Sequence, residues 1–206
     1  MALADFFDQV PPLRLRDRLA QLLGASDDGL IDYRYTDAVR LAGHSCPTVA
    51  GAWLMARAGL AALYPDAVPE RGGISVFLPD AEDEGVTGVI GQILTLVTGA
   101  AAANGFHGLG GDHRRCGLLH YHTTGVDGVR LRRDDTGDTV EVQYNPRVVP
   151  GDPEQMTLMG AVLHGTADAA QARRFGALWQ DRVRRILLEH ADDTSMIRVR
   201  RIGLPA

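Results

Sequence analysis

The spacing of apolar positions predicts long buried helices in the first half of the chain. Residues 48–64 follow Pro47 as an apolar, alanine-rich run that ends at Pro65, which predicts a helix buried on most of its sides. Residues 86–103 form a second apolar run of helical length. Leucines on one face of residues 13–23 predict a shorter, amphipathic helix.

Strand-like segments and a helical C-terminal region complete the pattern. The expected strands are residues 74–78, 116–122, 129–133, 139–144 and 196–202, of which the third and fourth form a hairpin around residues 134–138. Two further helices are expected at residues 154–163 and 167–190. These elements predict an α+β fold, in which long apolar helices pack on a mixed or antiparallel sheet and a helical segment follows.

Length and composition fit a single domain. The chain has 206 residues, of which 45% are hydrophobic, so it can bury a core of its own. We expect one domain over residues 1–206, with a core of about residues 30–145 and a helical extension of about residues 152–206.

The charge pattern excludes some functions. The formal net charge is -5 and no basic block occurs, which argues against a dedicated nucleic-acid surface. All 21 basic residues are arginine, so chemistry that needs a Schiff-base or P-loop lysine is excluded. Arginines alternate with apolar residues over residues 173–187, which is typical of an amphipathic core or oligomer helix rather than an RNA surface.

No segment approaches the roughly 18 to 20 uninterrupted apolar residues of a membrane span, so no membrane partner is expected. The first residues lack the basic and apolar regions of a secretory signal. The chain has two cysteines, each with a histidine nearby, which favours a metal or redox role in a reducing compartment over a disulfide framework. We therefore expect a cytoplasmic protein.

Both cysteines are paired with a histidine at metal-ligand spacing. His44 and Cys46 form an H-x-C motif, and His113 and Cys116 form an H-x-x-C motif. Two thiolates and two imidazoles make a set that Zn²⁺ binds tetrahedrally and for which other borderline metals compete. A single ion held by both motifs requires that they meet in the fold.

The local context of each motif favours such chemistry. Pro47 suits a first helical position, which places Cys46 at the helix cap, where free N–H groups and the helix dipole favour its thiolate. His113 and Cys116 lie where a glycine-rich loop becomes a strand, and Asp112 could fix the tautomer of a ligating imidazole.

Nearby histidines could be ligands, proton-transfer groups or solvent-exposed side chains. His107 precedes the second motif, and His120 and His122 share one face of the predicted strand if that strand is regular. The simpler alternative is that two buried cysteines lie near scattered histidines by composition alone. A thiol peroxidase or Cys–His nucleophile, which needs one cysteine and one histidine, is a third alternative.

Other features carry weaker signals. The acidic residues 80–84 are typical of a solvated helix start, although Asp80 or Glu84 could supply an oxygen ligand or a general base. Residues 108–111 are glycine-rich but do not form a nucleotide-binding fingerprint, because no strand directly precedes them and no helix is expected after them.

The segment Gly43-His44-Ser45-Cys46-Pro47 resembles the G-H-x-C-P motif of the FmdE-like family, which is named after one component of molybdenum formylmethanofuran dehydrogenase. Residues 86–104 are similar to that family's second helix, with its V-T-G stretch, and residues 175–190 are similar to the tails of bacterial members. The resemblance covers roughly residues 30–145. It implies an α+β domain, often dimeric, with a metal site, commonly zinc, that uses His44 and Cys46. Many bacterial members stand alone with no settled activity, and a fold does not carry its chemistry with it.

The chain also departs from this family. No cysteine lies between Cys46 and Cys116, the C-terminal cysteine-rich zinc ribbon is absent, and Thr48 stands where relatives favour glycine. The metal shell must then be completed differently, with His113 and Cys116 as the first candidates and His107 or His120 as further ones.

These observations lead to one expectation for function. We expect a metal-binding homodimer in which Zn²⁺ is held by four residues: His44, Cys46, His113 and Cys116. Another transition metal or haem could take such a site, and an open position on the metal would suit a small-molecule ligand and Lewis-acid or water-activating catalysis. Three histidines are the candidates for moving protons in catalysis: His107, His120 and His122. The alternatives are a non-catalytic metal or haem carrier or sensor, and a structural zinc protein that acts through its dimer surface.

Overall fold

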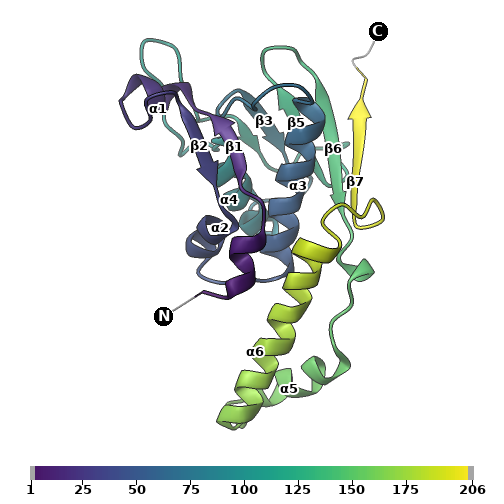
Figure 1. The fold of residues 1–206 in the computed structure, drawn as a ribbon. Coiled ribbons are helices and arrows are strands. Elements are labelled where there is room, and N and C mark those ends of the chain that lie inside the picture. The colour runs from purple at the N-terminus through teal and green to yellow at the C-terminus, as the bar shows by residue number, and fades with distance from the viewer. Residues whose placement is uncertain (1–2, 204–206) are drawn as a thin grey trace.

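The structure is a computed structural model that describes residues 3–203, so the ends of the expected single domain, residues 1–2 and 204–206, lie outside the described residues (Figure 1). The α-helices are α1 Arg18–Leu22, α2 Tyr35–Ala42, α3 Pro47–Leu63, α4 Thr87–Thr98, α5 Pro153–Leu163 and α6 Ala169–Arg184. The strands are β1 Leu13–Arg16, β2 Leu30–Tyr33, β3 Ile74–Phe77, β4 Leu119–His120, β5 Val129–Arg133, β6 Thr139–Tyr144 and β7 Ile197–Ile202. Short helical turns cover Asp5–Gln9, Pro146–Val148 and Arg185–Glu189.

Two sheets together with these α-helices confirm the α+β class. The larger sheet has the strand order β4-β3-β5-β6-β7, in which β3 and β4 are parallel and the other neighbours are antiparallel. The strands β1 and β2 form a separate antiparallel pair. The mixed sheet and the apolar helices against it are those that the sequence predicts.

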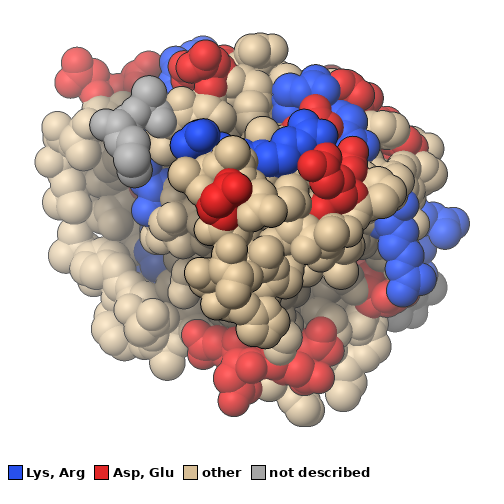
Figure 2. Space-filling view, turned by 90° about the horizontal axis from the view of Figure 1, so that it is seen from below, with Lys and Arg blue, Asp and Glu red and all other residues tan. Residues whose placement is uncertain are grey.

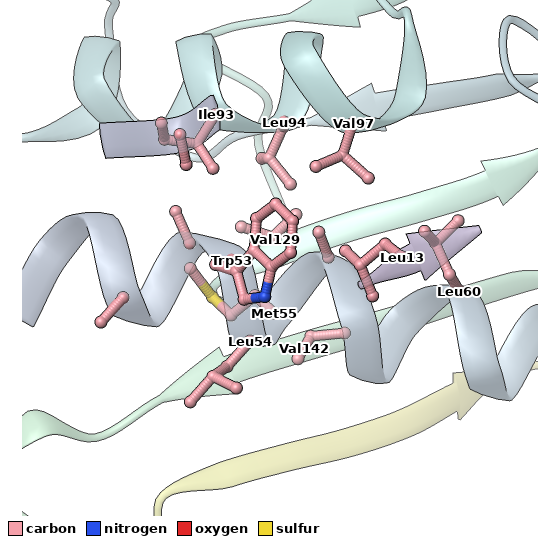
Figure 3. Close-up of a cluster of buried hydrophobic side chains, with 14 of the residues drawn as sticks. Leu13, Trp53, Leu54, Met55, Leu60, Ile93, Leu94, Val97, Val129 and Val142 are labelled. Atoms are coloured by element: carbon pink, nitrogen blue, oxygen red, sulfur yellow. The ribbon is translucent and has the colours of Figure 1, made fainter. Parts of the chain in front are cut away.

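Helix α3 is the centre of the core. It lies between α4, which contributes Ile93, Leu94 and Val97, and the sheet, which contributes Val129 and Val142 (Figure 3). Apolar residues therefore surround α3, as its nearly continuous apolar sequence predicts.

Two glycines bring α3 close to the sheet. A Cβ atom added at Gly51 would lie 2.2 Å from the ring of Tyr144, and one added at Gly59 would lie 2.2 Å from Leu131. Any larger residue at these positions would push the helix away from β5 and β6, so the glycines set the distance between the layers.

The structure corrects three of the predicted elements. Residues 13–23 are not one helix, because β1 occupies 13–16 and pairs with β2, with Leu13 and Leu15 buried on one side. The helix expected at 86–103 ends at Gly99, whose φ of 75° forms a left-handed cap.

The strand expected at 116–122 is only Leu119–His120. The φ angles of Gly117 (68°) and His122 (53°) are positive and interrupt the extended backbone on either side. His120 and His122 therefore do not share the face of one regular strand.

The C-terminal region forms a helical hairpin. Figure 1 shows that α5 and α6 extend away from the sheet and that a turn after α6 leads into β7, which returns to the edge of the sheet. Within the described residues, no helix combines the length and the hydropathy that a membrane crossing requires.

Candidate functional site

The two cysteine motifs lie at opposite ends of α3. Cys46 is the N-cap of this helix, whereas His113 lines a cavity together with Tyr64, which is the C-cap. The helix has 17 residues, so its ends are about 25 Å apart at 1.5 Å per residue. Within residues 3–203, no group of three or more His, Cys, Asp or Glu side chains is close enough to hold a metal ion. The fold thus does not bring together the four residues expected to share one ion.

The first motif caps α3. Pro47 occupies the first turn, and the Sγ atom of Cys46 accepts a hydrogen bond from the backbone N–H of Val49 at 3.5 Å, as a helix cap should. The cysteine is buried, whereas His44 is exposed and its Nδ1 lies 2.9 Å from the carbonyl of Ala42. The predicted cap position of Cys46 is confirmed.

Helix α6 fixes this motif from the other side. The carbonyl oxygen of Ser45 accepts hydrogen bonds from Nε1 of Trp179 (3.1 Å) and Nε2 of Gln180 (3.0 Å). The Ser45 hydroxyl lies 2.9 Å from the hydroxyl of the buried Tyr35. Because the carbonyl of Ser45 binds α6 and its hydroxyl contacts a buried tyrosine, the motif joins α6 to the core.

Tyr144 lies beside the same cap. Burial raises its pKa to about 12; the positive charge of Arg182 acts against this shift, and Cys46 adds to it. Its hydroxyl is buried and has no hydrogen-bond partner among the described residues. The phenol therefore stays protonated near neutral pH and is no ready source of a base.

The second motif belongs to a glycine-rich loop that is folded back on itself. The carbonyl of Phe106 accepts hydrogen bonds from the backbone N–H groups of Arg115 (2.8 Å) and Cys116 (3.1 Å). A Cβ atom at Gly105 would lie 2.6 Å from the backbone nitrogen of Cys116, so only glycine allows this approach. The fold-back brings the ring of His107 next to Cys116.

Among the cysteines and histidines predicted for the site, Cys116 and His107 are the pair in direct contact. The distance between Sγ of Cys116 and Nδ1 of His107 is 3.4 Å. Cys116 is 8% exposed, and His107 is exposed. A thiol at this distance from an imidazole can share a proton with it or bind a metal ion jointly with it.

The other predicted residues of this region are placed around the pair without joining it. His113 has a positive φ of 60°, which is uncommon outside glycine, and lines a cavity of about 660 Å³ together with Asp112 and Arg115. The ring of His120 stacks on Phe77, with 4.7 Å between the ring centroids.

His122 is likewise separate. It is exposed, and its backbone N–H donates to the carbonyl of Asp80 at 2.9 Å. Of the three histidines that the sequence proposes for proton transfer, only His107 is in contact with a cysteine.

A buried charge cluster that the sequence does not reveal lies next to this loop. Oδ1 of Asp17 accepts a hydrogen bond from Nη2 of Arg115 (2.7 Å), and Oδ2 accepts one from Nη1 of Arg71 (2.8 Å). Asp17 and Arg115 are buried. Residues 17, 71 and 115 are too far apart in sequence to form a short motif. The one local sign of this cluster is the pair Gly72-Gly73 after Arg71, which indicates a turn there.

The electrostatics of this cluster follow from its geometry. Burial on its own would raise the pKa of Asp17, but the hydrogen bond from Arg71, that from the N–H of Ala20 and the charge of Arg115 outweigh it, so the pKa is lowered. Burial lowers the pKa of Arg115, against the effect of Asp17. Two guanidinium groups share one carboxylate, so these three side chains together carry a formal charge of +1.

The sequence was compared with protein-family models and with curated proteins. No protein-family model matches the sequence, and no curated protein matches it either.

Proposed function

We propose that the glycine-rich loop binds a zinc ion, or another borderline transition-metal ion, through Cys116 and His107. The observation that carries this proposal is the 3.4 Å distance between Sγ of Cys116 and Nδ1 of His107. Three residues of the same loop, Asp112, His113 and Arg115, line a cavity of about 660 Å³, and His107 itself is exposed, so an ion could reach the pair.

The distance fits joint coordination. A Zn–S bond of about 2.3 Å and a Zn–N bond of about 2.0 Å at a tetrahedral angle place the two donor atoms about 3.5 Å apart. The pair therefore needs little movement to hold an ion. Two protein donors leave the other positions to water, to a small-molecule ligand or to donors from a second copy of the chain.

The resemblance of the first motif to the FmdE-like family implies a metal site that uses His44 and Cys46. In our proposal His44 and Cys46 do not contribute to the metal shell, because Cys46 caps α3 at the far end from Cys116. With two protein ligands the ion exchanges more readily than a four-ligand structural zinc. Open positions would let it act as a Lewis acid or activate water.

A second candidate function uses the same pair without a metal. A thiol within hydrogen-bond reach of an imidazole is the arrangement of a Cys–His nucleophile, in which the imidazole takes the thiol proton. Cys116 is favoured over Cys46 for this role because the Sγ atom of Cys46 has a backbone N–H as its partner instead.

A Co²⁺ titration tests the metal proposal, because cobalt replaces zinc in Cys–His sites and a thiolate–cobalt bond absorbs in the near ultraviolet. We expect this band in the wild-type protein, its loss in Cys116→Ser and a much weaker band in His107→Ala. Cys46→Ser is the matched control, since it removes the other cysteine and should keep the band. A band that disappears in Cys46→Ser and persists in Cys116→Ser would overturn the proposal.

Alkylation of metal-free protein separates the two candidates. In the Cys46→Ser background only Cys116 reacts with iodoacetamide. A nucleophile activated by His107 should react well below pH about 8.5, the ordinary thiol pKa, and His107→Ala should shift the rate profile back to that pKa. Low-pH reactivity that depends on His107, without any cobalt band, would replace the metal proposal by the nucleophile.

We further propose that the protein is a cytoplasmic homodimer. Both cysteines are free thiols, which suits a reducing compartment. Helix α5 is rich in apolar residues, yet the only residue that it buries is Gln155, while Met156 and Leu163 are 66% and 77% exposed. Figure 2, the view from below Figure 1, shows mainly uncharged side chains in the middle of that face and acidic and basic groups around it. The exposed apolar side chains of α5 suit a contact with a second copy of the chain.

A further inference from the structure

The cavity beside the glycine-rich loop has an unusual concentration of guanidinium groups. It has a volume of about 660 Å³, and its lining includes four arginines, one histidine and one tyrosine: Arg18, Arg71, Arg115, Arg133, His113 and Tyr64. This volume lies within the range of small-molecule sites, which is about 300 to 1,000 Å³.

Three of these arginines are committed to other groups. Arg18 pairs with Glu70 (2.9 Å), and Arg133 pairs with Asp135 (2.7 Å) while its guanidinium lies 4.1 Å from the centre of the Tyr64 ring. Arg71 pairs with Asp17 and also donates to backbone carbonyls of α4. Their charges are largely compensated where they stand.

Arg115 differs from them. It is 8% exposed, yet only its Nη2 atom forms a hydrogen bond among the residues of 3–203, to Asp17. Its Nε and Nη1 atoms are not sealed inside the protein, since neither belongs to the fully enclosed polar atoms without a partner. A buried guanidinium with unused N–H donors at a cavity is suited to hold an anion, because Arg presents several donors in a fixed fork.

The backbone makes room for this guanidinium. A Cβ atom at Gly72, whose φ is 83°, would lie 1.1 Å from Nη1 of Arg115, and one at Gly99, whose φ is 75°, would lie 3.1 Å from the same atom. Glycine is the residue that tolerates both the positive φ and the close approach. The two glycines cradle Nη1, while Asp17 holds Nη2.

We propose that this cavity binds a small organic molecule through a carboxylate or phosphate group, which Arg115 holds with His113 as a second donor. His113 lines the cavity and has a left-handed φ of 60°, which non-glycine residues seldom adopt. Residues in such rare backbone conformations cluster at ligand sites. The lining also holds three carboxylates: Glu70 and Asp135 are paired with Arg18 and Arg133, and Asp112 is exposed to solvent. This site goes beyond the metal pair and does not depend on it.

Isothermal titration of metal-free, full-length protein with inorganic phosphate, and separately with acetate at matched ionic strength, tests the proposal. We expect saturable binding. Saturation with phosphate alone identifies a phosphate group as the ligand's anchor, and saturation with acetate identifies a carboxylate. No saturable binding of either probe would overturn the proposal.

Variants show whether Arg115 is responsible. Arg115→Gln should weaken binding at least about tenfold, since a hydrogen bond to a charged group contributes roughly 1.5 to 3 kcal/mol. Arg114→Gln is the matched control, because Arg114 is exposed and does not line this cavity. Equal affinities of Arg115→Gln and Arg114→Gln would overturn the proposal.

Two further variants keep the test decisive. If Arg115→Gln does not fold, His113→Ala should still weaken binding several-fold, and unchanged affinity in that variant would count against the site. Cys116→Ser should bind the probes as the wild type does, so failure of the metal proposal and failure of this one are distinguishable.

Discussion

Asp17 carries two structural roles through one carboxylate. It caps α1 by accepting hydrogen bonds from the N–H groups of Leu19 (3.0 Å) and Ala20 (3.1 Å), and it forms ion pairs with both Arg71 and Arg115. The second role joins three distant parts of the sequence at the wall of the cavity. A side chain with so many partners in a buried place is costly to lose, because each partner is left unpaired.

The lowered pKa of Asp17 predicts an acid-sensitive contribution to stability. Burial acts against this shift, but the interactions with Arg71, Ala20 and Arg115 prevail, so the folded-state pKa lies below the unfolded one. The stabilisation is therefore complete above the unfolded pKa of about 3.9 and is lost as the pH falls through the folded pKa. We expect the free energy of unfolding to fall less between pH 7 and pH 3 in Asp17→Asn than in the wild type.

Urea unfolding at several pH values measures this difference. Asp17→Asn should also be less stable at pH 7 by roughly 3 to 5 kcal/mol, the usual cost of breaking a buried ion pair. Asp32→Asn is a suitable control, since Asp32 pairs with Arg14 at 2.7 Å on the surface and should cost at most about 1 kcal/mol. Equal pH profiles for the wild type and Asp17→Asn would show that Asp17 does not titrate as the geometry requires.

At the scale of elements, the sheet has an ionic group on β6, next to its edge strand β7. Glu141 of β6 is 2% exposed and is paired in register with Arg130 of β5 and Arg200 of β7. Its Oε2 accepts from Arg130 (2.9 Å) and its Oε1 from Arg200 (2.7 Å). One carboxylate therefore links three adjacent strands.

Replacing Glu141 should loosen the edge of the sheet. We expect Glu141→Gln to lower the free energy of unfolding by about 1 to 3 kcal/mol; the cost is smaller than for a fully buried pair because Arg200 reaches solvent. Hydrogen exchange should show faster opening of β7 than of β3. Combining Glu141→Gln with Arg200→Gln should cost less than the sum of the two changes, and strict additivity would argue against the link.

The elements also show how far the sequence alone leads. The helix at 48–64 and the hairpin at 129–133 and 139–144 were predictable because their apolar periodicity and turn residues are local signals. The sequence predicts helix instead of strand at 13–16, because the alternation there is short and leucines also occur at helical spacing. The register of this strand is set by its partner β2, which is distant in sequence.

The candidate site was less predictable for a physical reason. Spacing along the chain showed that Cys46 could cap a helix, but not that α3 would separate Cys46 from Cys116. The contact between Cys116 and His107 arises from a fold-back of the glycine-rich loop, and the partners of Asp17 come from residues 71 and 115. Such meetings depend on tertiary packing, which one sequence does not display.

At the scale of the whole molecule, the α5–α6 hairpin leaves one of its helices, α5, largely exposed. It extends from the core (Figure 1) and carries exposed apolar side chains on α5. If it forms the dimer contact, changing that surface should alter association and leave the core intact.

Light scattering coupled to size-exclusion chromatography tests this expectation. Met156→Glu with Leu163→Glu should convert a dimer into a monomer while the free energy of unfolding of the monomeric core stays within about 1 kcal/mol. The matched control is Leu22→Glu with Leu23→Glu, which alters two leucines on and next to α1 that are 60% and 64% exposed. A wild-type mass equal to one chain, or an equal effect of both double variants, would contradict a contact through α5.

The hydrogen bond from Trp179 to the Ser45 carbonyl has a practical consequence. The chain has two tryptophans. Trp53 is fully buried in the core, and Trp179 lies on α6, where it binds the first motif. In a Trp53→Phe protein, all tryptophan fluorescence comes from Trp179 of α6. Its emission wavelength depends on the polarity around the indole ring. A red shift of that emission ahead of global denaturation would signal detachment of α6. The fluorescence of Trp179 therefore reports how stably α6 is attached to the core.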